Sequence, residues 1–148
     1  MPFPVFAVKG DHNVAIGCMA MRAIGSGNVN SQPSHNVVIG RQAGYSLSTT
    51  SHSVFLGNGA AKGLISGNNN LAIINGAMTC SVTASNTIAM GGSAGRCITS
   101  GDSNIAIGFL AGCNIGSCNC NIFIGRYAGQ MGGSNSNIAI CCKAGRCL

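Results

Sequence analysis

The sequence NIFIGRYAG at residues 121–129 is one of eight related copies that recur along the chain, and this repetition is the strongest indication of the fold. Each copy has a small polar residue, three apolar or small residues, a glycine in most copies, two variable residues and Ala. The copies begin at Asn13, Asn36, Ser53, Asn70, Thr87, Asn104, Asn121 and Asn137. These starts are separated by 23, 17, 17, 17, 17, 17 and 16 residues. A nearly fixed period of this length is typical of a solenoid, in which every repeat forms one coil stacked on the last.

The first and third residues after each start are large and apolar, which predicts a short strand in every repeat. The first column is Val14, Val37, Val54, Leu71, Ile88, Ile105, Ile122 and Ile138, and the second is Ile16, Ile39, Leu56, Ile73, Met90, Ile107, Ile124 and Ile140. Residues two apart lie on one face of a strand, so we expect both columns to face the core. The sequence therefore predicts an all-β parallel β-solenoid of about eight coils with a 17-residue repeat.

The residue between these two columns should then point outward, yet it is never polar. This middle column is Ala15, Val38, Phe55, Ala72, Ala89, Ala106, Phe123 and Ala139. A strand with one free face usually alternates apolar with polar residues. The pattern predicts that the middle column is an oligomer interface, buried against copies of the same chain. The alternative is a single-chain solenoid with a mildly apolar face.

Two further columns predict the rest of the coil. Alanine is present in every repeat, at Ala20, Ala43, Ala60, Ala77, Ala94, Ala111, Ala128 and Ala144, which indicates an inward, tightly confined position. A later apolar column, Ile24, Leu47, Leu64, Ile98 and Ile115, predicts a second wall of the core, interrupted by Ser81 and Gly132.

Composition limits the class of protein. The 148 residues suffice for one domain, 23 of them are Gly, and charged residues make up 7% against a usual ~25%. No apolar run approaches the ~18 residues of a membrane span, and the first ten residues lack the features of a signal peptide. We expect residues 1–10 to form an N-terminal cap or docking segment and residues 11–148 to form the solenoid. The longer first gap predicts an insertion loop at about 28–33.

The nine cysteines do not follow the pattern of a disulfide scaffold or a zinc finger. We expect most of them to be free thiols that act as small apolar fillers. Cys80 and Cys97 occupy one column in adjacent repeats, so a bridge between them is geometrically allowed.

The basic residues also recur at fixed positions and give a net charge of +6. One column contains Arg22, Lys62, Arg96 and Arg146, and another contains Arg41 and Arg126. Two interpretations stay open: like charges that keep rods from stacking sideways, or contact with a polyanion such as an acidic glycan. Nucleic acid is disfavoured, because seven aromatic residues give no visible stacking platform.

Three histidines, His12, His35 and His52, each precede a repeat start and should stack on one another. Symmetric rings of these residues in a trimer could hold a metal, but three turn histidines on a stacked surface are the simpler explanation. The sequence offers few candidate catalytic residues, since Asp11 and Asp102 are the only carboxylate side chains and no catalytic motif is present. We expect neither an enzyme nor a cofactor.

The phrases NVAIG (13–17), NVVIGRQAG (36–44), NIAIGFLAG (104–112) and NIFIGRYAG (121–129) resemble the repeats of viral and phage tail-fibre proteins. They are also similar to the head repeats of trimeric autotransporter adhesins. The resemblance covers about residues 11–148. It implies a parallel β-roll, left-handed in the adhesin heads, that assembles as a homotrimer.

Together these observations predict a non-enzymatic structural component of a virus particle, namely a fibre, spike or surface-decorating subunit. Its expected partners are its own copies, other virion proteins and an acidic surface glycan, without nucleic acid or membrane insertion. Its expected location is the virion, after assembly in the host cytoplasm. The alternatives are a receptor- or glycan-binding adhesin and a monomeric ice-binding solenoid, the latter suggested by a column of Ser and Thr at one turn.

Overall fold

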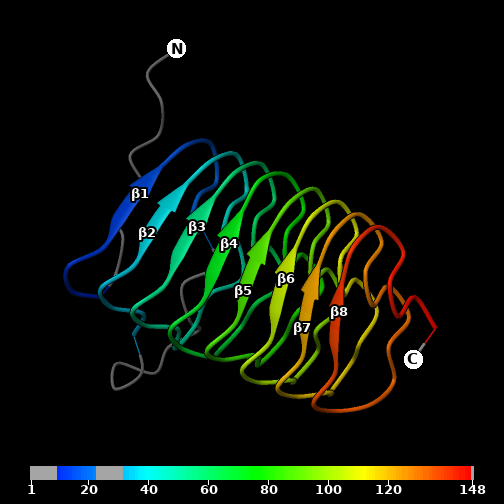
Figure 1. The fold of residues 1–148 in the computed structure, drawn as a ribbon. Helices are drawn as coiled ribbons and strands as arrows, with labels where there is room; N and C mark the ends of the chain where they lie inside the picture. Colours follow the sequence, from blue (N-terminus) through cyan, green and yellow to red (C-terminus); the bar gives the residue numbers. More distant parts are fainter. Residues whose placement is uncertain (1–9, 23–31, 148) are drawn as a thin grey trace.

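The computed structural model describes residues 10–22 and 32–147, and it is an all-β parallel solenoid with one short strand in each repeat (Figure 1). The strands are β1 (Val14–Ile16), β2 (Val37–Ile39), β3 (Val54–Leu56), β4 (Leu71–Ile73), β5 (Ile88–Met90), β6 (Ile105–Ile107), β7 (Ile122–Ile124) and β8 (Ile138–Ile140). They form a single sheet in the order of the sequence. The described residues include no helix that is long and apolar enough to cross a membrane.

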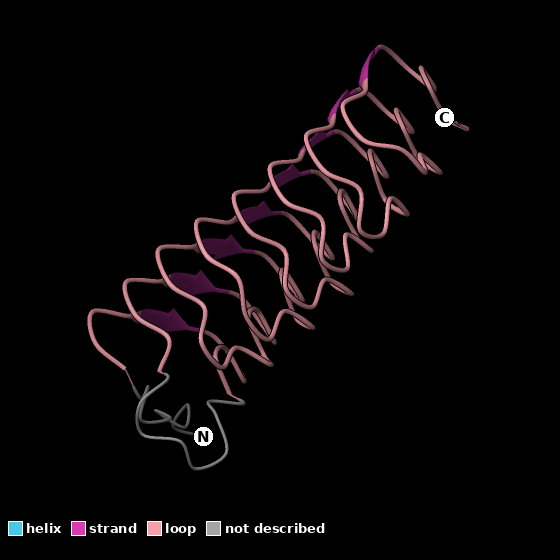
Figure 2. Cartoon of the chain, turned by 90° about the horizontal axis from the view of Figure 1, so that it is seen from below, coloured by secondary structure: helices cyan, strands magenta, loops and turns pink. Residues whose placement is uncertain are grey.

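Every strand pairs in parallel with the next one, and the repeat sets the register. Ala15 of β1 aligns with Val38 of β2, and Phe123 of β7 aligns with Ala139 of β8. Figure 2 shows the coils stacked along one axis, with all the strands on the same side. The predicted β-solenoid is therefore confirmed, including the alignment of the eight repeat starts. Residues 1–9 of the predicted cap (1–10) and residues 28–31 of the predicted insertion loop (28–33) lie outside the described residues.

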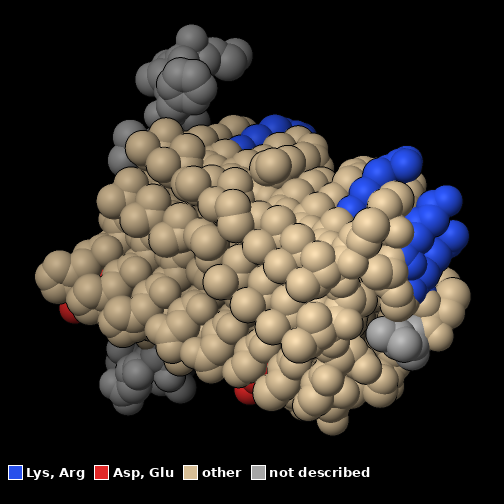
Figure 3. All heavy atoms as spheres, viewed as in Figure 1, with Lys and Arg blue, Asp and Glu red and all other residues tan. Residues whose placement is uncertain are grey.

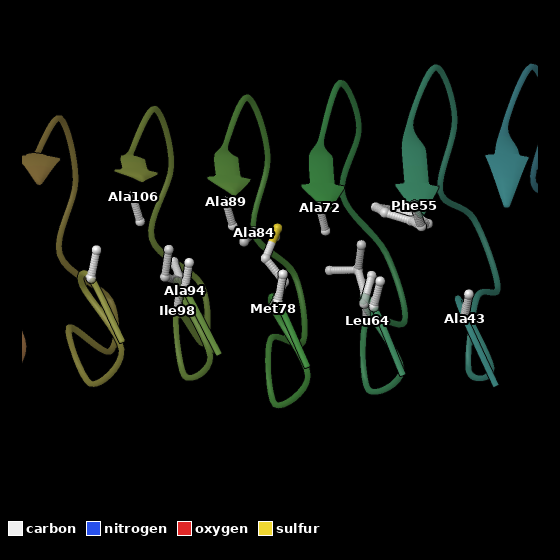
Figure 4. Close-up of a cluster of buried hydrophobic side chains, with 14 of the residues drawn as sticks. Ala43, Phe55, Leu64, Ala72, Met78, Ala84, Ala89, Ala94, Ile98 and Ala106 are labelled. Carbon is white, nitrogen blue, oxygen red and sulfur yellow. The ribbon is translucent and has the colours of Figure 1, made fainter. Parts of the chain in front are cut away.

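The two faces of the strands are the reverse of what the sequence pattern led us to expect. The middle residue of each strand points into the coil, and the large residues on either side of it point outward. Phe55 and Phe123 are 0% exposed within the single chain. Figure 4 shows Ala72, Ala89 and Ala106 directed toward the opposite wall of their coils. The predicted inward position of the columns around Val14 and Ile16 is therefore wrong.

The reason for this reversal is the size of the coil. The lumen lies between the strand and the invariant alanine column, which is buried as predicted from Ala20 to Ala128. Four residues of the second predicted wall are also confirmed, since Leu47, Leu64 and Ile98 are fully buried and Ile115 is 2% exposed, while Ile24 lies outside the described residues. A lumen closed by these residues leaves room for a methyl group at most middle positions, so the branched residues have to face outward.

In the seventh coil the middle residue is large and the opposite wall is correspondingly small. The Phe123 ring fills the seventh coil, where Gly132 stands in the column that holds Leu47, Leu64 and Ile98 in other coils. A β-carbon added at Gly129 would collide with the Phe123 ring, and one added at Gly132 would lie 3.3 Å from its Cζ. Glycine therefore interrupts the second wall at position 132 because the Phe123 ring occupies the space of a side chain there.

The fourth coil shows the converse arrangement. Its middle residue is Ala72 and its wall residue is Ser81, and Met78 fills the remaining space with 0% exposure. Figure 4 places Met78 and Ala72 on facing sides of the lumen. Met78 occupies the column in which the seventh coil has Gly129, with φ of 54° at both positions. The fourth and seventh coils therefore share one backbone but place their largest core side chain at different positions, Met78 in the fourth and Phe123 in the seventh.

The glycine that follows most strands is required by the close approach of successive coils. At Gly91, φ is +139°, and a β-carbon there would lie 2.6 Å from the carbonyl oxygen of Gly108. Side chains are tolerated at this corner only at Ile74 and Cys141, whose φ angles are 84° and 123°. Such values are uncommon for residues with a β-carbon, which explains why glycine occupies the corner in the other repeats.

The repeat start is polar because it forms a buried ladder of hydrogen bonds between coils. The backbone amide of Ser53 donates to Oδ1 of Asn36 (3.0 Å), and the amide of Asn121 donates to Oδ1 of Asn104 (3.0 Å). Nδ2 of Asn104 in turn donates to the carbonyl oxygen of Cys118 (2.8 Å). The asparagine thus satisfies backbone groups that the three-residue strands leave unpaired.

A second ladder runs along the turn that precedes the strands. The amide of Ser85 donates to Oδ1 of Asp102 (2.8 Å), and the amide of Asp102 donates to Oδ1 of Asn119 (2.7 Å). Asp102 is therefore one member of a row of turn residues, in the place that Asn68 and Asn119 hold in other coils. This role is structural.

Candidate interaction surfaces

The outer face of the sheet is a regular surface that is apolar along its whole length. It consists of the first and third residues of the eight strands, all of them Val, Leu, Ile or Met. We call this surface the outer strand face. Its most exposed members range from Met90 at 37% to Ile138 at 69%. Along the rod the side chains repeat every ~4.8 Å, and across each strand the two columns are ~7 Å apart.

The predicted oligomer interface therefore has to be corrected. Its residues, Ala15, Val38, Phe55, Ala72, Ala89, Ala106, Phe123 and Ala139, line the core of a single chain, and all except the partly buried Ala15 are enclosed and not available to a partner. The apolar surface that does face solvent is made by the neighbouring positions. One sequence signal pointed to this arrangement: the middle column is mostly alanine, and a narrow core takes the smaller residue.

The two predicted basic columns are in register in the structure. The amide of Gly63, next to Lys62, donates to the carbonyl oxygen of Thr79, and the amide of Cys80 donates to that of Arg96, at 2.9 and 2.8 Å. Arg22, Lys62 and Arg96 thus lie at every second coil of one column, with other residues between them. Spacing alone does not bring these three side chains together.

Two basic residues from different columns do converge, on Tyr127. The guanidinium carbon of Arg126 lies 4.6 Å from the centre of the Tyr127 ring, and that of Arg146 lies 5.8 Å from it. Nε of Arg146 also donates to Oε1 of Gln130 (2.8 Å). Phe109 packs edge-on against Tyr127, with ring centres 5.6 Å apart and planes at 81°. We call these five residues the tyrosine cluster.

Sequence reasoning named the two arginines of this cluster but missed its aromatic and amide members. The signal was available, since Phe109 and Arg126 follow the corner glycine in adjacent repeats and Tyr127 is the next residue along the chain. Figure 3 shows the blue basic side chains gathered mostly near the end of the rod where β8 lies, away from the red acidic ones. A smaller contact occurs in the first coils, where Nη1 of Arg22 donates to the Tyr45 hydroxyl (3.1 Å).

The three histidines stack as predicted, on the exposed turn before β1, β2 and β3. The ring centres of His12 and His35 are 4.7 Å apart, and those of His35 and His52 are 4.9 Å apart. Nearly parallel rings at this spacing hold equivalent nitrogens ~4.8 Å apart, whereas two ligands of one tetrahedral zinc are separated by ~3.3 Å. Within the described part of one chain, no group of three or more residues is arranged to hold a metal ion. A metal shared between three copies stays a prediction.

The cysteines differ from their predicted role as fillers. All nine are free thiols, but only Cys113 is buried and six of the nine are exposed. Partial desolvation of the Cys80 sulfur and its hydrogen bond with the neighbouring Cys97 thiol raise the pKa of Cys80 above its ordinary value, although the residue is exposed as a whole, and burial raises the pKa of Cys113. Both thiols are therefore held more firmly in the protonated form, which is the poorer nucleophile.

The part of the chain that the structure describes brings together no acid, base and nucleophile. Asp102 belongs to the turn ladder, and Asp11 lies on the same turn of the first coil, where its carbonyl oxygen accepts from the amide of His35 (3.0 Å). The surfaces that this chain offers are suited to binding through apolar contact at the outer strand face and through positive charge at the tyrosine cluster.

Comparisons with known proteins return no relative: no protein-family model matches the chain, and neither a curated protein nor a solved structure is significantly similar to it.

Proposed function

We propose that this chain is a non-enzymatic structural protein that assembles with copies of itself through the outer strand face. One observation carries the proposal: all the outward positions of eight consecutive strands are apolar. Single exposed apolar residues are normal on a protein surface, but a continuous strip of eight strands is not. The strip covers on the order of 400 Å², which is the size of the largest apolar patch on a typical monomer, and patches of this size are often functional.

A second copy of the same chain is the occupant that best matches this strip. Both surfaces then have the same ~4.8 Å repeat, so the ridges of one can fit between those of the other along the whole rod. The strip contains no charged residue that would be buried without a partner. A binding partner without this period would meet the ridges at only a few places.

We propose three copies rather than two. Around a three-fold axis, the first outer column of one chain would pack against the second outer column of the next, and all three strips would be covered at once. The resemblance of the repeats to those of tail fibres and trimeric adhesin heads supports the same number. On this basis we propose that the protein is a fibre, spike or surface-decorating subunit of a virus particle, in contact with other virion proteins.

Size measurement by light scattering tests the assembly. The native protein is expected to elute with three times the mass of one chain. Replacing Met90 and Ile107 of the outer strand face by Lys should give monomers that keep a β circular-dichroism spectrum. The matched control replaces Ile65 and Val82, which are exposed but lie outside that face, by Lys. A compact wild-type monomer, or equal loss of assembly in the control, would contradict the proposal.

The ice-binding alternative has less support. The hydroxyl column, for example Thr49, Thr83 and Ser100, is exposed but only one residue wide. The outer strand face carries no hydroxyl group. A monomeric protein that slowed ice growth would favour it over assembly.

A further inference from the structure

We propose that the tyrosine cluster is a binding site for an acidic polysaccharide, which it recognises by its carboxylate or sulfate groups. This site is distinct from the outer strand face and goes beyond the structural role proposed above. It lies on the turn that follows β6, β7 and β8, so a ligand bound there would leave the outer strand face free for assembly.

The first step is the unbalanced charge of the cluster. Arg126 and Arg146 approach the same ring, and the backbone amide of Lys143 donates to the carbonyl oxygen of Arg126 (2.8 Å), which places a third basic residue on the neighbouring coil. The chain has only two Asp or Glu residues, and β6 separates Asp102 from this turn. Like charges held together in this way favour an anion from outside.

The second step is the orientation of the guanidinium groups. Stacking on Tyr127 holds Arg126 by a cation–π contact, and the bond from Nε to Gln130 holds Arg146. The terminal nitrogens of Arg146 are left with N–H groups that no described residue accepts. A guanidinium whose plane is already fixed loses less entropy when it donates two parallel bonds to a carboxylate or sulfate.

The third step distinguishes a polysaccharide from a nucleic acid. Phe109 is 47% exposed beside the cations, and it provides one apolar platform on which the non-polar face of a sugar can rest. Single-stranded nucleic acid requires a row of rings and a basic groove along the backbone. Here the Tyr127 ring is already covered by cations, and the next cation of the same columns, Arg96, lies two coils from the seventh.

Binding of the full chain to three polysaccharides tests the proposal. Dextran sulfate and alginate carry sulfate and carboxylate groups respectively, and dextran is neutral. We expect the first two to bind and dextran not to bind. The double variant Arg126→Gln/Arg146→Gln should weaken binding at least tenfold. The control, Arg41→Gln/Arg96→Gln, removes the same charge from the same two columns, away from Tyr127, and should change binding less than threefold.

A third variant separates positioning from charge. Tyr127→Asn keeps every cation, and asparagine tolerates the φ of 60° at this position. It should weaken binding about fivefold, because the Arg126 guanidinium loses its support. All variants should keep the oligomer size of the wild type, so that failure here is distinguishable from failure of the assembly proposal. Equal losses in the two double variants, retention of dextran, or displacement of alginate by a lower concentration of single-stranded DNA would overturn the proposal.

Discussion

The inner and outer faces of the same eight strands differ in side-chain size more than in polarity. The inner column is alanine at five of its eight positions, and the outer columns are almost entirely Val, Leu and Ile. Both faces are apolar, so the hydrophobic pattern alone does not distinguish them. In a coil of about seventeen residues the core is the narrower of the two environments, and the bulky residues are excluded from it.

A buried charge provides the strongest test of this comparison. Ala106→Asp, on the inner face of β6, places a carboxylate in the closed lumen without a partner. We expect it to cost about 5 kcal/mol or to prevent folding. The control Ile107→Asp, on the outer face of the same strand, should no longer assemble with other copies of the chain but should keep the native circular-dichroism spectrum. If both variants were equally unfolded, the assignment of the two faces would be wrong.

Loss of the largest core side chain should have the next largest effect. Phe123→Ala removes the ring that occupies the space at Gly129 and Gly132, and the glycines cannot refill the cavity. The free energy of unfolding should fall by about 3–5 kcal/mol in urea titrations. Ile124→Ala, next to it on the outer face, should reduce the stability of the monomer by about 1 kcal/mol or less.

The polar ladder extends the comparison to hydrogen bonds. Asn104→Ala leaves the amide of Asn121 and the carbonyl oxygen of Cys118 without their buried partner. The free energy of unfolding should fall by about 2 kcal/mol. Asn104→Thr should cost less, because Thr87 already occupies an equivalent position. The exposed Asn114→Ala serves as the control and should leave unfolding unchanged within error.

The smallest expected effect is a gain of stability. The Ser81 hydroxyl is buried in the fourth coil and has no hydrogen-bond partner. Ser81→Ala removes this unsatisfied group at little cost in volume, and it should raise the free energy of unfolding by about 1 kcal/mol. The exposed Ser100→Ala should have no effect in the same urea titration. Destabilisation by Ser81→Ala would indicate that the hydroxyl has a partner after all.

The sequence was sufficient to predict the period, the strands, the alanine column and the stacked histidines, because each follows from residues that recur at a fixed spacing. It was not sufficient to orient the strands. Alternation with period 2 assigns residues such as Ile105 and Ile107 to one face and Ala106 to the other, but it does not say which face is enclosed. That choice depends on the width of the coil, which is a property of the folded backbone.

The tyrosine cluster was only partly predictable for a similar reason. Columns of Arg126 and Arg146 are visible in the sequence, but they are offset by four residues within the repeat. Their convergence on Tyr127 depends on how the turn after the strand folds back, with φ of 60° at the tyrosine itself. Residues in one column are neighbours along the rod, and the sequence period reveals them. Arg126 and Arg146 belong to different columns and meet only because the turn brings them together, which the period does not reveal.

The difference in core side-chain size between coils has a consequence for how the chain folds. Coils with identical backbones could in principle dock on the wrong neighbour, since a parallel ladder shifted by a whole repeat keeps all its backbone hydrogen bonds. The ring of Phe123 lies against Gly112 of the preceding coil as well as Gly129 of its own. A shifted seventh coil that met Met78 in the same column would find that space already filled. The different core side chains thus favour the native order of the coils, because stacking in another order would produce steric clashes that the backbone alone would not.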